Sequence, residues 1–147
     1  MVQPRRLLTL DSNVLIAALK EDEPHSEKVS NTKPRARQFI LSEPSIIYQE
    51  VCGTLARRAG VDIADQARKQ LDLIIHPRLF VNCDRAFCVS AYPLCAKYDI
   101  YAIDAIYLKV ALDNRAVLVS LNKEDFIDKL KRKKPPIEAY HVTEFPY

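Results

Sequence analysis

Short apolar runs that alternate with helical patterns constrain the fold of this chain more than any other feature. The run "LLTL" at residues 7–10 precedes a helical pattern at residues 13–19, and "AVLVSL" at residues 116–121 precedes another at residues 123–130. Strands that alternate with helices in this way indicate units in which the strands pair in parallel. The sequence therefore predicts an α/β fold with a mainly parallel central sheet.

The other segments continue the same alternation. Further strands are expected at residues 38–41, 79–82 and 139–145. Further helices are expected at residues 24–30, 44–60, 64–75, 86–97 and 105–113, with the fourth of these bent or interrupted near Pro93. Because the chain has 147 residues and no internal repeat, a single domain over residues 1–147 is expected.

Composition excludes several classes of protein. The chain is 48% hydrophobic and 28% charged, which fits neither a disordered nor a membrane-spanning protein. No apolar run approaches the roughly 18 residues that a membrane span needs. With only two glycines, the chain has no glycine-rich phosphate loop. The first residues lack the zones of a signal peptide, so we expect an intracellular, cytoplasmic protein.

The cysteines and histidines give no strong indication of a site. The four cysteines lack CxxC spacing, so small buried apolar residues are favoured over a zinc site or a disulfide framework. These cysteines are Cys52, Cys83, Cys88 and Cys95. The three histidines lie outside every motif described below, and structural roles are expected for them.

Polar residues stand where functional groups of a parallel sheet gather, beyond the carboxyl ends of strands. Asp11 ends the first strand, and Glu50 lies beside the apolar stripe of the helix at residues 44–60. Asp104 begins "DAIYLKVAL", and Asn122 and Asp125 follow "VLVS". Each has an ordinary alternative: Asp11 and Asp104 suit helix N-caps, Asp125 suits a first turn, and Glu50 suits a solvent-facing position.

Glu50 and Asp104 fit these ordinary alternatives least well. Both stand among apolar residues, where an acid needs a partner. Carboxylates that crowd together repel one another and take up protons unless a cation screens them. Hard oxygen ligands of this kind suit Mg²⁺ or Mn²⁺, which bind phosphates well. The acids therefore predict a divalent metal site.

Three motifs resemble the PIN domain family, most closely the VapC-type toxin ribonucleases of VapBC toxin–antitoxin pairs. They are "LDSNVLIAAL", "PSIIYQEVCGTLARR" and "YAIDAIYLKVALDNRAVLVSLNKEDF", in the order in which the family has them. The resemblance implies a PilT N-terminus-like three-layer α/β/α sandwich. It also implies a Mg²⁺- or Mn²⁺-dependent endoribonuclease that hydrolyses RNA phosphodiester bonds.

The resemblance also implies roles for single residues. Asp11, Glu50 and Asp104 match the first three acids of the family site, and Ser12 matches the small hydroxyl residue beside the first acid. A metal held by these acids would polarise the scissile phosphate and lower the pKa of a bound water. An acid such as Glu50 would orient that water for in-line attack on phosphorus.

The fourth acidic position departs from the family pattern. Counted from Ser120, it holds Asn122 instead of an aspartate, and Asp125 lies three residues further on. Asn122 offers a carbonyl oxygen but no charge, so binding of a second metal ion is expected to be weaker. Either Asn122 or Asp125 fills the fourth position, and we favour a functional Asp125.

The formal net charge is only +3, but it is unevenly distributed. The basic run at residues 129–134 is either a solvated helix end or a contact for RNA phosphates. Its candidate RNA-binding residues are Lys131, Arg132, Lys133 and Lys134.

The resemblance implies three partners: an RNA substrate, a small antitoxin protein and a second copy of the chain in a homodimer. Apolar helix faces at residues 14–19 and 46–55 are candidates for the protein contacts, although the core has a prior claim on them. Two other functions stay open. One is a housekeeping PIN nuclease in ribosomal RNA processing. The other is a catalytically weakened PIN-like module that binds RNA or protein, which Asn122 keeps in consideration.

Overall fold

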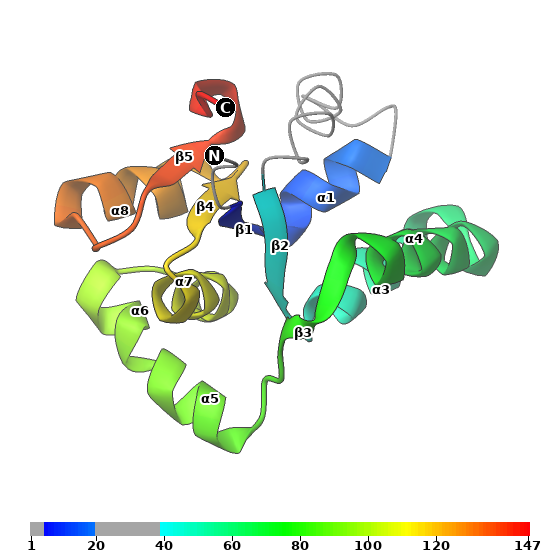
Figure 1. Cartoon of the computed structure of the whole chain (residues 1–147), viewed down its shortest axis with the longest axis horizontal. Coiled ribbons are helices and arrows are strands. Elements are labelled where there is room, and N and C mark those ends of the chain that lie inside the picture. Colours follow the sequence, from blue (N-terminus) through cyan, green and yellow to red (C-terminus); the bar gives the residue numbers. More distant parts are fainter. Residues whose placement is uncertain (1–4, 20–38) are drawn as a thin grey trace.

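The protein forms a five-stranded parallel sheet in the strand order β3-β2-β1-β4-β5 (Figure 1). The computed structural model describes residues 5–19 and 39–147. Its strands are β1 (Arg6–Leu10), β2 (Phe39–Pro44), β3 (Ile75–Val81), β4 (Val117–Ser120) and β5 (Ala139–His141). Every paired neighbour runs in parallel, which confirms the predicted sheet type.

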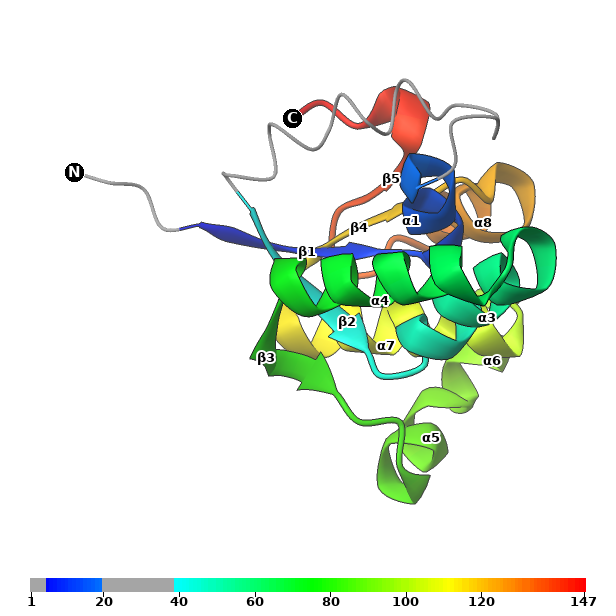
Figure 2. The ribbon, with the colours of Figure 1, turned by 90° about the vertical axis from the view of Figure 1, so that its right-hand side faces the viewer.

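Helices cover both faces of the sheet and make three layers (Figures 1 and 2). One layer holds α1 (Ser12–Leu19), α3 (Ile47–Ala59) and α4 (Val61–Ile74), with α3 packed against both others. The other holds α5 (Arg85–Ala91), α6 (Pro93–Tyr98), α7 (Ala102–Asn114) and α8 (Asp128–Lys133). This is the expected α/β/α sandwich.

Most of the predicted elements are present, with different ends. The helix expected from Pro44 begins at Ile47, because Pro44 still pairs in β2 with Val81 of β3. The helix expected near Pro93 is two helices, with Pro93 as the first residue of α6, where its missing amide costs nothing. The helix expected at residues 24–30 lies outside the described residues.

The chain after β4 and β5 departs from regular structure. The first turn after β4 is a π-helical turn over Lys123–Ile127, and α8 follows it directly. The final strand is short, because Val142–Glu144 form a 3₁₀ turn in place of the predicted extension.

The core lies between the sheet and both helical layers. β4 is buried at all four positions, and Tyr107 of α7 and Phe126 are fully buried beside it. The four cysteines are free thiols, and the prediction that they are buried is wrong, because Cys88 is exposed and the other three are only half-buried. Within the described ranges, no helix has the length and apolar character needed to cross a membrane.

The burial of β4 predicts a strong effect of shortening one of its side chains. Leu118 is 0% exposed, so Leu118→Ala is expected to lower the free energy of unfolding by about 2–5 kcal/mol. Leu73→Ala is the control: at 86% exposure, it is expected to change that value by less than about 0.5 kcal/mol. Urea titration measures both, and equal effects would contradict this description of the core.

Candidate active site

The candidate site lies where the chain reverses its order across the sheet. β1 stands between β2 and β4, so the connections that follow β1 and β4 leave the sheet in opposite directions. In open parallel sheets, ligands bind at this switch point, beyond the carboxyl ends of the strands. Asp11 directly follows β1, and Ser120 ends the neighbouring β4. The sheet thus brings together two residues that lie far apart in the sequence.

Asp11 is held firmly despite its burial. It is 4% exposed, its Oδ2 accepts a hydrogen bond of 2.7 Å from the Ser120 hydroxyl, and its backbone amide donates to the Val119 carbonyl. The backbone amide of Ser12 also bonds to the Asp11 carboxyl group. Ser12 and Ser120 were both predicted to support the site; Ser120 contacts the first acid through its hydroxyl, and Ser12 contacts it through its backbone amide.

Asn13 ties the start of α1 to the end of β4. Its Nδ2 donates to the Ser120 hydroxyl at 3.4 Å, and its Oδ1 accepts from the Leu121 amide at 3.2 Å. The sequence indicated only a helix start at Asn13. Its role as a bridge between α1 and β4 depends on the pairing of β1 with β4 and is visible only in the structure.

Glu50, one turn into α3, faces α7. Its Oε1 accepts a hydrogen bond of 2.6 Å from the hydroxyl of Tyr107, which is fully buried. The half-buried Glu50 therefore points into the protein and not into solvent, which rules out the solvent-facing alternative. Tyr107 was missed by sequence analysis, since a tyrosine within the apolar run of α7 is indistinguishable there from a core residue.

Asp104 is the third residue of α7, and Tyr101 occupies the N-cap. The alternative of Asp104 as an N-cap is therefore wrong, because the helix begins at Ala102, three residues earlier than expected. Asp104 Oδ2 accepts from Asn122 Nδ2 at 3.4 Å, and the charge of the exposed Asp125 raises the pKa of Asp104. Both candidates for the fourth position therefore lie near the third acid.

The acids repel one another. Burial raises the pKa of Asp11 to about 7, with further increases from the charges of Asp104 and Glu50, while Ser120 lowers it. Burial, Glu50 and Asp125 raise the pKa of Asp104 to about 6. None of the ion pairs that the structure describes includes Asp11, Glu50 or Asp104. None of these ion pairs therefore compensates the negative charge of the cluster.

The donor set fits a hard divalent cation, although the side chains have not converged on one point. Carboxylate oxygens suit Mg²⁺ or Mn²⁺, and a cation at this position would relieve the repulsion. In the described part of the chain, no three acidic, histidine or cysteine side chains are close enough together to hold a metal as they stand. Side-chain movement would therefore accompany binding.

Glu43 is a further acid that sequence analysis missed. It lies in β2, is 0% exposed, and its Oε1 accepts a hydrogen bond of 2.6 Å from the Leu10 amide. Burial raises its pKa well above the usual range, and the charge of Asp11 adds to this. The predicted strand ended at residue 41 and the next predicted helix began at Pro44, so Glu43 lay outside every predicted element.

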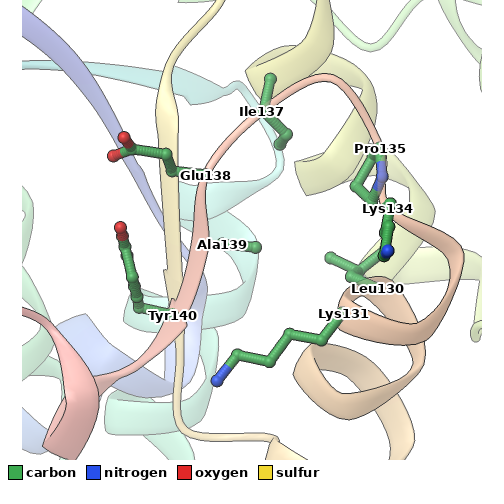
Figure 3. Close-up of a pocket in the computed structure, with 8 residues that line it drawn as sticks. All are labelled: Leu130, Lys131, Lys134, Pro135, Ile137, Glu138, Ala139 and Tyr140. Carbon is green, nitrogen blue, oxygen red and sulfur yellow. The ribbon is translucent and has the colours of Figure 1, made fainter.

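The basic run lies at the end of α8 and the residues that follow it. Lys131 and Lys134 line a pocket of about 280 Å³ beside the start of β5, together with Glu138 and Tyr140 (Figure 3). Lys131 also forms an ion pair with Glu144. The structure describes no contact between this run and the acids, and its binding to RNA stays a prediction.

The pKa of Asp11 predicts how stability depends on pH. The pKa of Asp11 is about 7 in the folded protein and about 3.9 in an unfolded chain, so the folded protein keeps this proton at pH values where the unfolded chain has lost it. The resulting contribution to the free energy of unfolding is lost as pH rises through 7. In EDTA, Asp11→Asn is expected to be ~2–4 kcal/mol more stable than wild type at pH 8, with a smaller difference at pH 5. The asparagine still accepts from Ser120.

Urea titrations at the two pH values measure this difference. Asp113→Asn, an exposed change on α7, is the control and is expected to leave the pH dependence of stability unaltered. If the stability of Asp11→Asn and of wild type depended on pH in the same way, the pKa of Asp11 would not be raised in the folded protein.

Several solved structures share this arrangement of strands and helices. VapBC2 from Rickettsia felis, bound to a promoter DNA fragment, has a TM-score of 0.65 at 13% identity, over 92% of this chain and 98% of that chain. VapBC from Salmonella typhimurium, bound to DNA, has a TM-score of 0.64 at 13% identity, over 95% and 99%.

VapC20 from Mycobacterium tuberculosis, a toxin that cleaves the sarcin–ricin loop, is also similar. Its TM-score is 0.62 at 13% identity, over 78% of this chain and 87% of that chain. Among curated proteins, none matches the sequence. The family model described as PIN domain matches residues 8–133, which include all of the candidate acids. The chain belongs to the PIN domain family.

Proposed function

We propose that this chain is a divalent-metal-dependent endoribonuclease and the toxin of a toxin–antitoxin pair. The observation that carries the proposal is the cluster of Asp11, Glu50 and Asp104, whose like charges act on one another at the switch point of the sheet. Membership of the PIN domain family supports it further, as does the fold shared with the VapBC proteins.

Each acid of the cluster has its own neutral hydrogen-bond donor. Ser120 donates to Asp11, Tyr107 to Glu50, and Asn122 to Asp104. Neutral donors fix the direction of a carboxylate without cancelling its charge, which is what the ligands of a cation need.

Asp11, Glu50 and Asp104 would hold Mg²⁺ or Mn²⁺, with Asn122 and Asp125 as further candidate ligands. Such an ion would polarise the scissile phosphate and lower the pKa of a bound water. Glu50 orients the attacking water and accepts its proton, while Tyr107 keeps Glu50 aimed. The new bond would join the water oxygen to phosphorus while the bond from phosphorus to the leaving ribose oxygen breaks, and that oxygen would take up a proton from solvent.

For the partners, we propose an RNA substrate, a small antitoxin and a homodimer. The solved VapBC structures are complexes with their antitoxins, which supports the second. The prediction that the helix faces at residues 14–19 and 46–55 make the protein contacts is wrong in part, because Val14, Val51 and Leu55 belong to the core. The exposed apolar residues of α4 offer a dimer surface instead; they are Val61, Ile63, Leu73 and Ile74.

Cleavage is expected to depend on a divalent ion. Purified protein free of antitoxin should cleave ribosomal RNA, tested with its sarcin–ricin loop as one substrate, in Mg²⁺ or Mn²⁺ and not in EDTA. Gel analysis of the RNA measures this. Full cleavage in EDTA would contradict the metal site, and binding of RNA without cleavage in any metal would favour the binding-module alternative.

Removing single charges from the cluster is expected to abolish most cleavage. Asp104→Asn and Glu50→Gln keep side-chain shape, and each should lower the cleavage rate about 10²-fold or more while the domain stays folded. Asp113→Asn makes the same chemical change on α7, away from the cluster, and should cleave normally. If Asp104→Asn cleaves at the wild-type rate, Asp104 is a structural residue.

The fourth position is tested by two neighbouring acids. Asp125→Ala is expected to weaken Mn²⁺ binding and slow cleavage, because the charge of Asp125 reaches Asp104. Glu124→Ala, an exposed change in the same turn, is the control. If Asp125 is only a first-turn acid, its loss lowers stability by about 0.3–1 kcal/mol and changes neither measurement.

Growth distinguishes a toxin from a housekeeping nuclease. Expression of a toxin in a bacterial host without its antitoxin should arrest growth, and Asp104→Asn should relieve the arrest. Normal growth with active enzyme would favour the role in ribosomal RNA processing.

A further inference from the structure

Glu43 is a buried acid that the proposed reaction does not yet use. It is 0% exposed in β2, and its Oε1 accepts a hydrogen bond of 2.6 Å from the Leu10 amide. Its Oε2 is buried and has no hydrogen-bond partner among the described residues. A half-satisfied carboxyl group in the core costs stability relative to an apolar side chain of similar size. A residue that lowers the stability of the fold in this way is expected to serve the function of the protein.

The hydrogen bond of Glu43 lies where the ladder between β1 and β2 stops. Backbone pairing in this ladder ends at Leu8 and Leu41. Thr9 then donates through its hydroxyl to the Ser42 carbonyl at 2.8 Å, and Leu10 donates to Glu43. The carboxyl end of β1 is therefore fastened to β2 by side chains and not by the backbone ladder.

The opposite edge of β1 is fastened to β4 at the next residue. The Asp11 amide donates to the Val119 carbonyl, and the Asp11 carboxylate accepts from Ser120. Leu10 and Asp11 are thus held from both sides of β1, by Glu43 and by β4. If the Glu43 contact is lost, the Leu10 amide loses its bond to β2, and Thr9 holds β1 to β2 only one residue earlier, while the β4 side still holds Asp11.

We propose that Glu43 is a positioning residue: by holding the Leu10 amide, it sets the place of the Asp11 carboxylate and thereby the affinity of the acid cluster for a divalent cation. This inference rests on the proposed function, because it assigns Asp11 to a cation. Residues that orient metal ligands from behind typically change metal affinity 10–100-fold when they are replaced.

Two variants of Glu43 separate geometry from charge. Glu43→Gln removes the ionisable carboxyl group but keeps a side-chain oxygen at the same reach, so it can still accept from Leu10. Glu43→Asp keeps the carboxyl group but is shorter by one methylene, which withdraws it by about 1.5 Å. Positioning predicts that the glutamine variant resembles wild type and that the aspartate variant does not.

Thr9→Val is the matched control. It removes a buried side-chain hydrogen bond between the same two strands, one residue before Leu10, and leaves the Glu43 contact in place. Any general loosening of β1 against β2 should affect this variant as much as Glu43→Asp. The free energy of unfolding of each variant, from urea titration, confirms that it is folded.

The experiment measures Mn²⁺ affinity by isothermal titration calorimetry and the hydrogen exchange of the Leu10 amide by NMR. Glu43→Asp is expected to bind Mn²⁺ about 10-fold or more weakly and to exchange Leu10 faster. Glu43→Gln is expected to remain within about threefold of wild type in Mn²⁺ affinity, far below that loss. Thr9→Val should match wild type in Mn²⁺ affinity.

Three results would overturn the inference alone, while wild type still binds Mn²⁺ and cleaves RNA. They are wild-type affinity in Glu43→Asp, an equal loss in Thr9→Val, or a loss in Glu43→Gln with none in Glu43→Asp. The last would make Glu43 a source of charge. If wild-type protein neither binds Mn²⁺ nor cleaves RNA, the proposed function fails, and the inference fails with it.

Discussion

The candidate site depends on one buried carboxylate, which lies where β1 pairs with β4. Asp11 is 4% exposed, and the cost of placing a charge there is offset only in part by the hydrogen bonds from Ser120 and from backbone amides. Ser120 reaches Asp11 because β4 pairs with β1, and that pairing requires the connection through both helical layers. The pairing of β1 with β4 thus holds the Asp11 carboxylate in a buried position that is unfavourable for its charge.

The burial that makes these acids costly for stability also supports the proposed metal-dependent cleavage. Acids whose pKa values are raised by burial and by one another are poorly stabilised without a cation, and the same features make them good ligands for one. Ser120, Tyr107 and Asn122 hold the acids without neutralising them. Stability and metal binding therefore make opposite demands on this cluster.

Sequence analysis predicted the fold well, because the fold depends on local patterns, whereas the roles of the acids stay predictions. The apolar runs of β1 and β4 and the acids Asp11 and Asp104 are recognisable from their neighbours along the chain. Ends of elements were less accurate: β2 continues to Pro44, and α7 begins two residues before Asp104.

What sequence analysis missed depends on contacts across the sheet. Glu43 reaches Leu10 over 33 positions, and Tyr107 reaches Glu50 over 57. No periodicity along the chain reports which side chain such a residue meets. A carboxylate directly after an apolar strand pattern, as in "FILSEP", was the one available sign of Glu43.

The π-helical turn after β4 affects how relatives of this chain should be aligned. In this turn the Ile127 amide bonds to the Asn122 carbonyl five residues earlier, so it contains one more residue than an α-helical turn would. A chain with an ordinary turn there would be one residue shorter between the strand and the helix. For such a chain, counting from Ser120 would not identify equivalent residues beyond this point, and a gap within residues 123–127 would be needed to compare Asp125 with its counterpart.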